Sequence, residues 1–305
     1  MGLIPAVDQP APAFVHIDVD DLRAIAECYG YTVPEEFVHH ITQQALPRFQ
    51  QLFAERNISA TFFLVGRDLE SPQYCEQIRA LLAADHRIAN HSYTHALNFR
   101  DLTTEQLTEE IRRTHRLCES RLGVTPSGFR APGYAWTPRL TDCLHALGYR
   151  YDASPMPSPY GGIFRALDKR MQKPGTVLAK TQYPLLGDTW RTLYPAPWRS
   201  TSLTVIPSAT SPMLRLPFQA GVCMRLGPAY FRTLLAPYRL YRALPLVFLF
   251  HAADLADFSQ VPVDLFRQSS FFASPLEKRL ALARLFLREI QNLRAIQTTE
   301  DWLSQ

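Results

Sequence analysis

Residues 14–21 read FVHIDVDD, an apolar run that ends in three closely spaced carboxylates. This pattern is typical of a buried strand with polar residues at its carboxyl end. Alternation along the strand puts Asp18 and Asp20 on the same side, with Asp21 on the other side unless the strand has already ended. Crowded carboxylates repel, which is costly for structure but useful where one binds a metal and another takes a proton. Helix capping by Asp20 or Asp21 is the structural alternative.

Short apolar strands and amphipathic helices alternate on both sides of this stretch. Such alternation predicts βαβ units, and therefore an α/β fold with a parallel sheet or barrel and functional residues at the carboxyl ends of its strands. His16 is expected only to pack in the interior. The patterns predict strands at 60–66, 87–90, 128–132 and 149–152, and helices at 34–55, 74–84, 104–122 and 138–147.

The regular pattern is lost between residues 154 and 218, which are rich in Pro and Gly. We expect an irregular insertion there, with LTVIP and MLRLPF as its only candidate strands. A single catalytic domain over 1–305 is expected. The later patterns predict a helix at 228–244, the strand LVFLF at 246–250, a helix at 275–292 and a short terminal helix capped by Thr298 or Thr299.

Composition excludes several classes of protein. With 47% apolar and 20% charged residues among 305, the chain is neither disordered nor a coiled coil. It has no apolar run long enough to span a bilayer and no signal-like start. Its five cysteines are odd in number and never form C-x-x-C, which argues against a disulfide framework or a thiolate zinc site. A cytoplasmic location and no nucleic-acid partner are expected, and the net charge of +4 says little by itself.

The motif HSYTH places His91 and His95 four residues apart. On a helix both imidazoles would project from one face and could bind one metal ion. That spacing alone is more often incidental than metal-binding. Polar residues also follow other predicted strands: Arg130 in FRAPGYAW, Asp152 in YRYDAS and His251 in FLFHAADLAD. Each of these, taken alone, fits a structural role as well as a functional one.

The order of these elements is informative: Asp-x-Asp, His-Ser-x-x-His, Arg-x-Pro, Asp and Leu-x-His, each at a predicted strand end. This set resembles the polysaccharide deacetylase family, the NodB-homology carbohydrate esterases, over about residues 13–304. The resemblance implies a distorted (β/α) barrel of about seven strands. It also implies one divalent metal ion, Zn²⁺, bound by one aspartate and two histidines.

The resemblance also implies a role for individual residues. Asp20, His91 and His95 match the metal ligands, Asp18 matches the catalytic base, and Arg130 matches the arginine that steadies the base. His251 matches the general acid, with Asp152 as its electrostatic partner. Leu249 matches a residue that lines the pocket for the acyl methyl group, and Gly133 matches the position whose backbone N–H binds the oxyanion.

The first motif departs from the family's usual T-F-D-D-G, because here it reads I-D-V-D-D. This leaves open whether Asp20 or Asp21 is the ligand, and it resembles the variant of deformylases that act on lipid-linked aminosugars. The leading interpretation is a metal-dependent N-deacetylase of an aminosugar in a cell-envelope glycan or its lipid-linked precursor. The alternatives are such a deformylase, a non-catalytic carbohydrate-binding barrel, and an allantoinase-like amidohydrolase.

The charges are unevenly distributed, because seven arginines and no acid lie between Asp188 and Asp254. Arg225, Arg232 and Arg239 recur every seven residues, which on one helix would form a basic stripe able to contact an anionic bilayer or a phosphate-bearing substrate. This would place the protein peripherally on the inner face of the membrane. The alternative is that these arginines pair with acids elsewhere in the fold.

Overall fold

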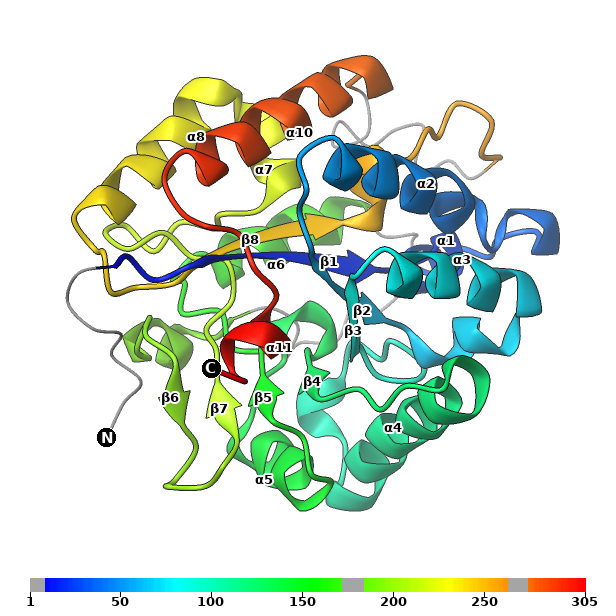
Figure 1. The fold of residues 1–305 in the computed structure, drawn as a ribbon. Helices are drawn as coiled ribbons and strands as arrows, with labels where there is room; N and C mark the ends of the chain where they lie inside the picture. Colours follow the sequence, from blue (N-terminus) through cyan, green and yellow to red (C-terminus); the bar gives the residue numbers. More distant parts are fainter. Residues whose placement is uncertain (1–8, 172–183, 263–273) are drawn as a thin grey trace.

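The computed structural model describes residues 9–171, 184–262 and 274–305. One sheet of eight strands runs in the order β6-β7-β5-β4-β3-β2-β1-β8, and every neighbouring pair is parallel except β6 and β7 (Figure 1). The strands are β1 Ala13–Val19, β2 Thr61–Leu64, β3 Arg87–Asn90, β4 Gly128–Phe129, β5 Tyr151–Asp152, β6 Ala196–Pro197, β7 Thr204–Val205 and β8 Leu246–His251. The sheet is an open half-barrel with edges at β6 and β8, so the predicted distorted barrel is confirmed, with eight strands in place of about seven.

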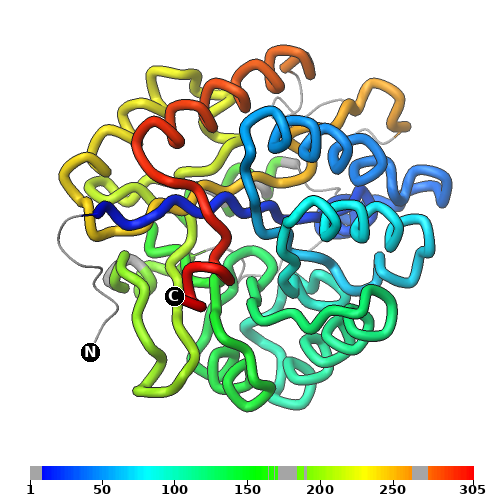
Figure 2. Tube along the Cα trace, viewed as in Figure 1, coloured from blue at the N-terminus to red at the C-terminus, as the bar shows by residue number. Residues whose placement is uncertain are grey.

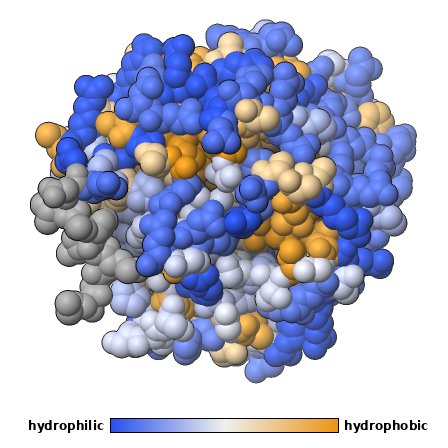
Figure 3. Space-filling model, viewed as in Figure 1, coloured by the Kyte–Doolittle hydropathy of each residue, from blue (hydrophilic) through white to orange (hydrophobic). Residues whose placement is uncertain are grey.

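Helices surround this sheet (Figures 1 and 2). They are α1 Leu22–Cys28, α2 His40–Ala54, α3 Pro72–Ala83, α4 Thr104–Leu117, α5 Pro138–Ala146, α6 Gly161–Met171, α7 Ala220–Leu226, α8 Pro228–Leu235, α10 Leu276–Gln291 and α11 Thr299–Trp302. Within the described ranges, no helix is both long and apolar enough to cross a membrane. The surface seen in Figure 3 is mainly hydrophilic, with a few apolar patches.

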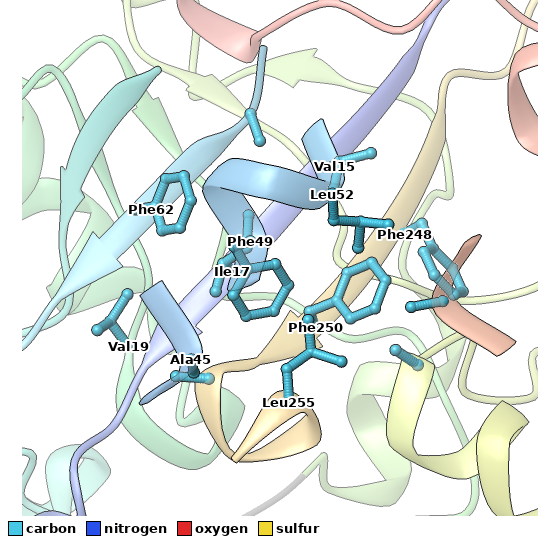
Figure 4. Packing of buried hydrophobic residues seen from close by; sticks show 14 of the residues in the cluster. Val15, Ile17, Val19, Ala45, Phe49, Leu52, Phe62, Phe248, Phe250 and Leu255 are labelled. Atoms are coloured by element: carbon cyan, nitrogen blue, oxygen red, sulfur yellow. The ribbon is translucent and has the colours of Figure 1, made fainter. Parts of the chain in front are cut away.

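The alternation along β1 decides which side chains reach the interior of the half-barrel. Val15, Ile17 and Val19 point outward and pack with Phe49 and Leu52 of α2 (Figure 4). The intervening residues of β1 therefore face inward, and they include both the histidine and the first aspartate of FVHIDVDD. All seven residues of β1 are buried, so two polar side chains lie at the centre of the core.

Two expectations about later segments need correction. The helix expected at 228–244 ends at Leu235, and a short 3-10 helix, Ala236–Arg239, follows it. The insertion between 154 and 218 is irregular as expected, and LTVIP contains β7. MLRLPF forms no strand, however, and contributes only the isolated bridge between Thr210 and Pro217.

The C-terminal segment closes the interior of the half-barrel at the amino ends of the strands. It lies beside the start of β1, where the amide of Ala13 donates to the carbonyl of Ala295 (Figure 2). Glu300 of α11 accepts hydrogen bonds from Thr61 at the start of β2, at 2.8 Å, and from Tyr151 at the start of β5, at 2.6 Å. This leaves the carboxyl ends of the strands as the place for a site.

Candidate active site and metal centre

The carboxyl ends of neighbouring strands bring the predicted residues together. Asp18 of β1 is the register partner of His251 of β8, and Asp20 follows β1 directly. His91 follows β3, and Arg130 follows β4. Because these strands are parallel, their carboxyl ends meet at one edge of the sheet. The site is therefore assembled from segments that are far apart in sequence.

HSYTH does not form a helix, which corrects the expected arrangement of its histidines. The segment is a loop in which Ser92 and His95 have left-handed backbone angles, with φ of 66° and 59°. Glu110 of α4 holds this loop, since its carboxylate accepts from the amide and the hydroxyl of Thr94, each at 2.9 Å. The imidazoles of His91 and His95 meet because the loop folds back, and not because of helical periodicity.

Three ligand atoms converge beside β1. Oδ1 of Asp20 lies 3.3 Å from Nε2 of His91 and 3.3 Å from Nε2 of His95. His91 is oriented by a 2.7 Å hydrogen bond between its Nδ1 and the carbonyl of Arg130. Oδ1 of Asp20 is buried and has no hydrogen-bond donor among the described residues. A buried carboxylate oxygen that faces two imidazole nitrogens fits a divalent cation, which would satisfy all three atoms at once.

The charge states also suit a cation. Burial lowers the pKa of His95 to about 4, so its imidazole is neutral at pH 7. Burial opposes ionisation of Asp20, but the neighbouring His95 and His91 outweigh it and lower the pKa of that carboxyl. Burial also lowers the pKa of His91, yet Asp18 and Asp20 raise it overall, so a proton would compete with a cation at this nitrogen.

The carboxylate of Asp21 has other partners than that of Asp20. Its carboxylate caps α1 through the amide of Leu22 at 2.8 Å, and it accepts from Thr42 at 2.6 Å and lies 3.1 Å from Nδ1 of His39. Asp21 therefore performs the helix-capping role that was the structural alternative for this motif. Asp20 is the carboxylate that faces the histidines.

Asp18 and Arg130 form a fully buried ion pair beside the ligand atoms. Nη1 of Arg130 donates to Oδ1 of Asp18 at 2.6 Å, and the guanidinium lies over the ring of Phe63 at 4.1 Å from its centroid. The other oxygen of Asp18 lies 3.9 Å from Nε2 of His251. His16, expected only to pack, also contacts Arg130: its Nδ1 lies 2.6 Å from Nη2. The signal available in the sequence was its position two residues before Asp18, on the same side of the strand.

The comparisons with known proteins agree with this geometry. Residues 30–151 match the family model described as polysaccharide deacetylase. This match covers 122 of the 305 residues and confirms the predicted resemblance to that family. The chain is 27% identical to the peptidoglycan deacetylase of Helicobacter pylori over 143 residues. The matched segment covers 46% of this chain and 48% of that protein. It is 37% identical to chitin deacetylase 1 of Cryptococcus neoformans over 79 residues. That segment covers 26% of this chain and 16% of that protein.

The structure is also similar to a solved structure from Mycobacterium smegmatis, of a protein assigned as a polysaccharide deacetylase. The TM-score is 0.63 at 19% sequence identity, over 99% of this chain and 92% of that chain. This likeness shows a shared fold. The matches to the two curated relatives span about half, or less, of the length of those proteins.

The contacts of Asp152 differ from those expected of an electrostatic partner of His251. Asp152 is buried and accepts from Thr141 and from the amide of Ser154, each at 2.9 Å, and no described contact joins it to His251. Asp254 does contact His251, since its Oδ2 accepts from the His251 amide at 2.9 Å. Asp152 lies on β5, and four strands separate β5 from β8 in the sheet, which the sequence alone does not reveal.

The loop that carries His251 is anchored by a buried arginine that the sequence analysis missed. Arg279 of α10 donates to the carbonyl of Asp254 at 2.7 Å and to that of Ala256 at 2.6 Å. The His251 side chain is one-third exposed, at 33%, whereas that of Asp18 is buried at 3%. A fixed loop therefore presents His251 toward solvent while Asp18 stays inside.

Gly133 and Leu249 lie around the same site. Gly133 has a left-handed φ of 57°, and Tyr134 after it has a φ of 58°, so the chain turns sharply directly after Arg-x-Pro. Leu249 is fully buried in the inner cluster that also contains Phe63 and Tyr134. Because Leu249 is two residues before His251 on β8, both side chains face the interior of the half-barrel.

The acid-free arginine stretch is partly neutralised by acids from other segments, and it forms no single helical stripe. Gly227 separates α7 from α8, so Arg225 and Arg232 lie on different helices. Among the described contacts, Arg191 pairs with Asp188, Arg199 with Asp142 and Arg232 with Glu289. The expected stripe at heptad spacing is therefore wrong.

Proposed function

We propose that this chain is a metal-dependent hydrolase that removes the N-acetyl group from an aminosugar of a cell-envelope glycan or of its lipid-linked precursor. The observation that carries the proposal is the convergence of Asp20, His91 and His95 beside the buried pair of Asp18 and Arg130. Relatives named for the deacetylation of peptidoglycan and of chitin support an N-acetylated glycan as the substrate.

Asp20, His91 and His95 would hold one divalent cation, for which we propose Zn²⁺. Two imidazoles and one carboxylate leave coordination positions open for water and substrate. When bound, such an ion supplies a Lewis acid that polarises the acyl oxygen and lowers the pKa of a coordinated water. The remaining chemistry belongs to the side chains around it.

Asp18 would take the proton of the attacking water through Oδ2, because Oδ1 is already paired with Arg130. Arg130 pairs with this carboxylate and limits its rotation. The amide of Gly133 would donate to the acyl oxygen as negative charge develops on it. Leu249 would form the apolar wall against which the acyl methyl group packs.

His251 would donate a proton to the departing amine. An amine leaves poorly as an anion, so bond cleavage requires this proton. The position of His251 supports the role, because Nε2 lies 3.9 Å from the base and the side chain is open to solvent. Asp254 fixes the backbone of His251 and would stabilise the imidazolium electrostatically.

The substrate is tested by incubating the zinc-loaded protein with N-acetylated oligosaccharides and with lipid-linked aminosugars, and measuring acetate and formate. Acetate release supports the proposal. Formate release alone would identify a deformylase, which the I-D-V-D-D motif favours as the second candidate. Glycan binding without release of either acid would identify a non-catalytic carbohydrate-binding barrel.

A lipid-linked substrate would bring the protein to an anionic bilayer, which we propose as a peripheral partner. The support is the surface at the two ends of α8, where exposed arginines adjoin exposed leucines: Arg225 beside Leu226, which is 55% exposed, and Arg239 beside Leu240, which is 82% exposed. Apolar side chains can enter the interface while guanidinium groups pair with lipid phosphates.

A further inference from the structure

A row of buried hydrogen bonds runs from the C-terminal helix to the carboxylate of Asp18. Oγ1 of Thr299 lies 2.8 Å from Nε2 of His16, and Nδ1 of His16 lies 2.6 Å from Nη2 of Arg130. Nη1 of Arg130 in turn lies 2.6 Å from Oδ1 of Asp18. All four side chains are buried, with exposures from 0% to 2%. The row therefore connects the closed end of the half-barrel with its open end.

The chemistry of the groups fixes the direction of these hydrogen bonds. A guanidinium only donates, so Nδ1 of His16 must accept, and the imidazole must be neutral with its hydrogen on Nε2. That hydrogen is then donated to the Thr299 hydroxyl. Burial lowers the pKa of His16 well below its usual value, and the charge of Arg130 lowers it further. Electrostatics and hydrogen-bond geometry thus require the same form of the imidazole.

His16 supplies one of three acceptors that surround the guanidinium of Arg130. Nε donates to the carbonyl of Ala153 at 3.2 Å, and the two terminal nitrogens donate to Asp18 and His16. The ring of Phe63 lies against the guanidinium face. Without His16, Nη2 would be buried with no acceptor from this row, and a turn of the guanidinium would carry Nη1 away from Asp18.

Thr299 is held in place independently of His16. Backbone hydrogen bonds tie the segment before it to β1, through Ala13 with Ala295 and Gln297 with Ala13. The next residue, Glu300, is bound by Thr61 and Tyr151 from two other strands. The hydroxyl that orients His16 therefore belongs to a segment fixed by contacts of its own.

We propose that His16 is a positioning residue, which transmits the placement of Thr299 in the C-terminal helix through Arg130 to the carboxylate of Asp18. The inference rests on the proposed function of Asp18 as the base. It assigns a role in the reaction to the C-terminal segment, although α11 lies at the opposite end of the strands from the substrate.

The test compares His16→Phe with His16→Asn. Phenylalanine keeps a ring against Phe14 and Phe63 but offers no acceptor to Arg130, whereas the asparagine carbonyl restores an acceptor close to the position of Nδ1. For His16→Phe we expect a loss of about 10- to 100-fold in kcat, with KM and zinc content unchanged. His16→Asn should recover most of the loss. Asp301→Asn, which alters a side chain of the same helix that pairs with Arg87 and not with this row, is the matched control and should keep wild-type kcat.

Two milder variants cover the case in which substitution of the buried histidine prevents folding. Thr299→Val removes the hydroxyl that accepts from Nε2 and should lower kcat, while Thr299→Ser retains the hydroxyl and should keep it. Equal kcat in both variants, or equal kcat in His16→Phe and wild type, would overturn the proposal.

A readout without substrate separates this inference from the proposed function. In ¹⁵N spectra of the imidazoles, His16 should remain the neutral Nε2–H form between pH 5 and 8. The terminal Arg130 nitrogens should give separate signals in the wild type and averaged signals in His16→Phe. A protonated His16, or an Arg130 that is equally fixed in the variant, would refute the inference. Failure of the wild type to release any acyl group would instead refute the proposed function.

Discussion

At the scale of single residues, identical side chains have different chemical roles because their contacts differ. Asp18, Asp20 and Asp21 lie within four positions of one another in the sequence. Asp18 pairs with Arg130, Asp20 faces two histidines, and Asp21 caps α1. Each carboxylate has its own partners in the fold, so each one can be tested by a separate substitution.

Replacement of Asp18 by Asn should remove turnover but leave the metal bound, because the change deletes the base and keeps the ligands. We expect kcat to fall by about 10²- to 10⁴-fold, the usual contribution of a general base. Zinc content by elemental analysis and acetate release by a coupled assay check this. Asp20→Asn is the matched control and should lose zinc. The reverse outcome, zinc lost in Asp18→Asn and kept in Asp20→Asn, would show that the two roles are exchanged.

His86 provides a test of stability that is independent of the site. Burial lowers its pKa to about 4, and its Nδ1 accepts from the amide of Ala60 at 3.3 Å. In the unfolded chain the pKa is about 6.5, so the stabilising contribution is present above pH 6.5 and is lost as the pH falls toward 4. The loss should be on the order of 3 kcal/mol.

Urea unfolding of wild type and His86→Gln at pH 7.5 and pH 4.5 measures this loss. The wild type should be more stable at the higher pH, and the difference between the two proteins should shrink at the lower pH. An equal difference at both values would mean that His86 is not kept neutral by the fold.

At the scale of elements, helices remote from the substrate hold the two loops that carry the histidines. Glu110 of α4 binds the His91–His95 loop, and Arg279 of α10 binds the loop after His251. The His91–His95 loop includes left-handed backbone angles at Ser92 and His95, which few residues adopt freely, so contacts from outside must stabilise it. The placement of these histidines therefore depends on packing of the outer helices.

Glu110→Ala should lower zinc affinity by about 10- to 100-fold, because the loop loses the carboxylate that binds the backbone between the two histidines. Glu109→Ala, an exposed acid on the same helix, is the matched control and should bind zinc as the wild type does. Competition with a chromogenic chelator gives both affinities. Equal affinity in the two variants would show that the loop keeps its shape without Glu110.

The sequence predicted which residues lie at strand ends, because alternation and strand-helix order are local patterns. It could not predict that His91 and His95 lie on a loop, since a spacing of four also fits a helix. It also could not distinguish Asp254 from Asp152 as the neighbour of His251, or find the contact between His16 and Arg130. These contacts join residues that are distant in sequence, and they depend on how the sheet curves.

At the scale of the whole molecule, the half-barrel has a closed end and an open end. The C-terminal helix α11 closes the amino ends of the strands, and the site occupies the carboxyl ends (Figure 1). The outer surface at the ends of α8 carries the exposed Arg225 and Arg239. A membrane-bound substrate would contact the molecule at two places, with its sugar in the site and its membrane against the surface at the ends of α8.

Sedimentation with anionic vesicles tests whether the surface at the ends of α8 binds a membrane. Binding of the wild type should weaken as salt rises and should weaken further in the Arg225→Gln, Arg239→Gln double variant, by about 1 kcal/mol for each arginine. Arg232→Gln, whose side chain is already paired with Glu289, is the control and should change binding less. Equal, salt-insensitive binding of all three proteins would contradict membrane contact through these arginines.

The most direct test of the central claim is a zinc titration of the chelator-treated protein with an N-acetylated oligosaccharide present, followed by acetate release. The wild type should release acetate in proportion to added zinc up to one equivalent, and the His91→Ala, His95→Ala double variant should bind no stoichiometric zinc and release none. Acetate release without zinc, or full zinc occupancy in the double variant, would contradict a deacetylase whose metal is held by Asp20, His91 and His95.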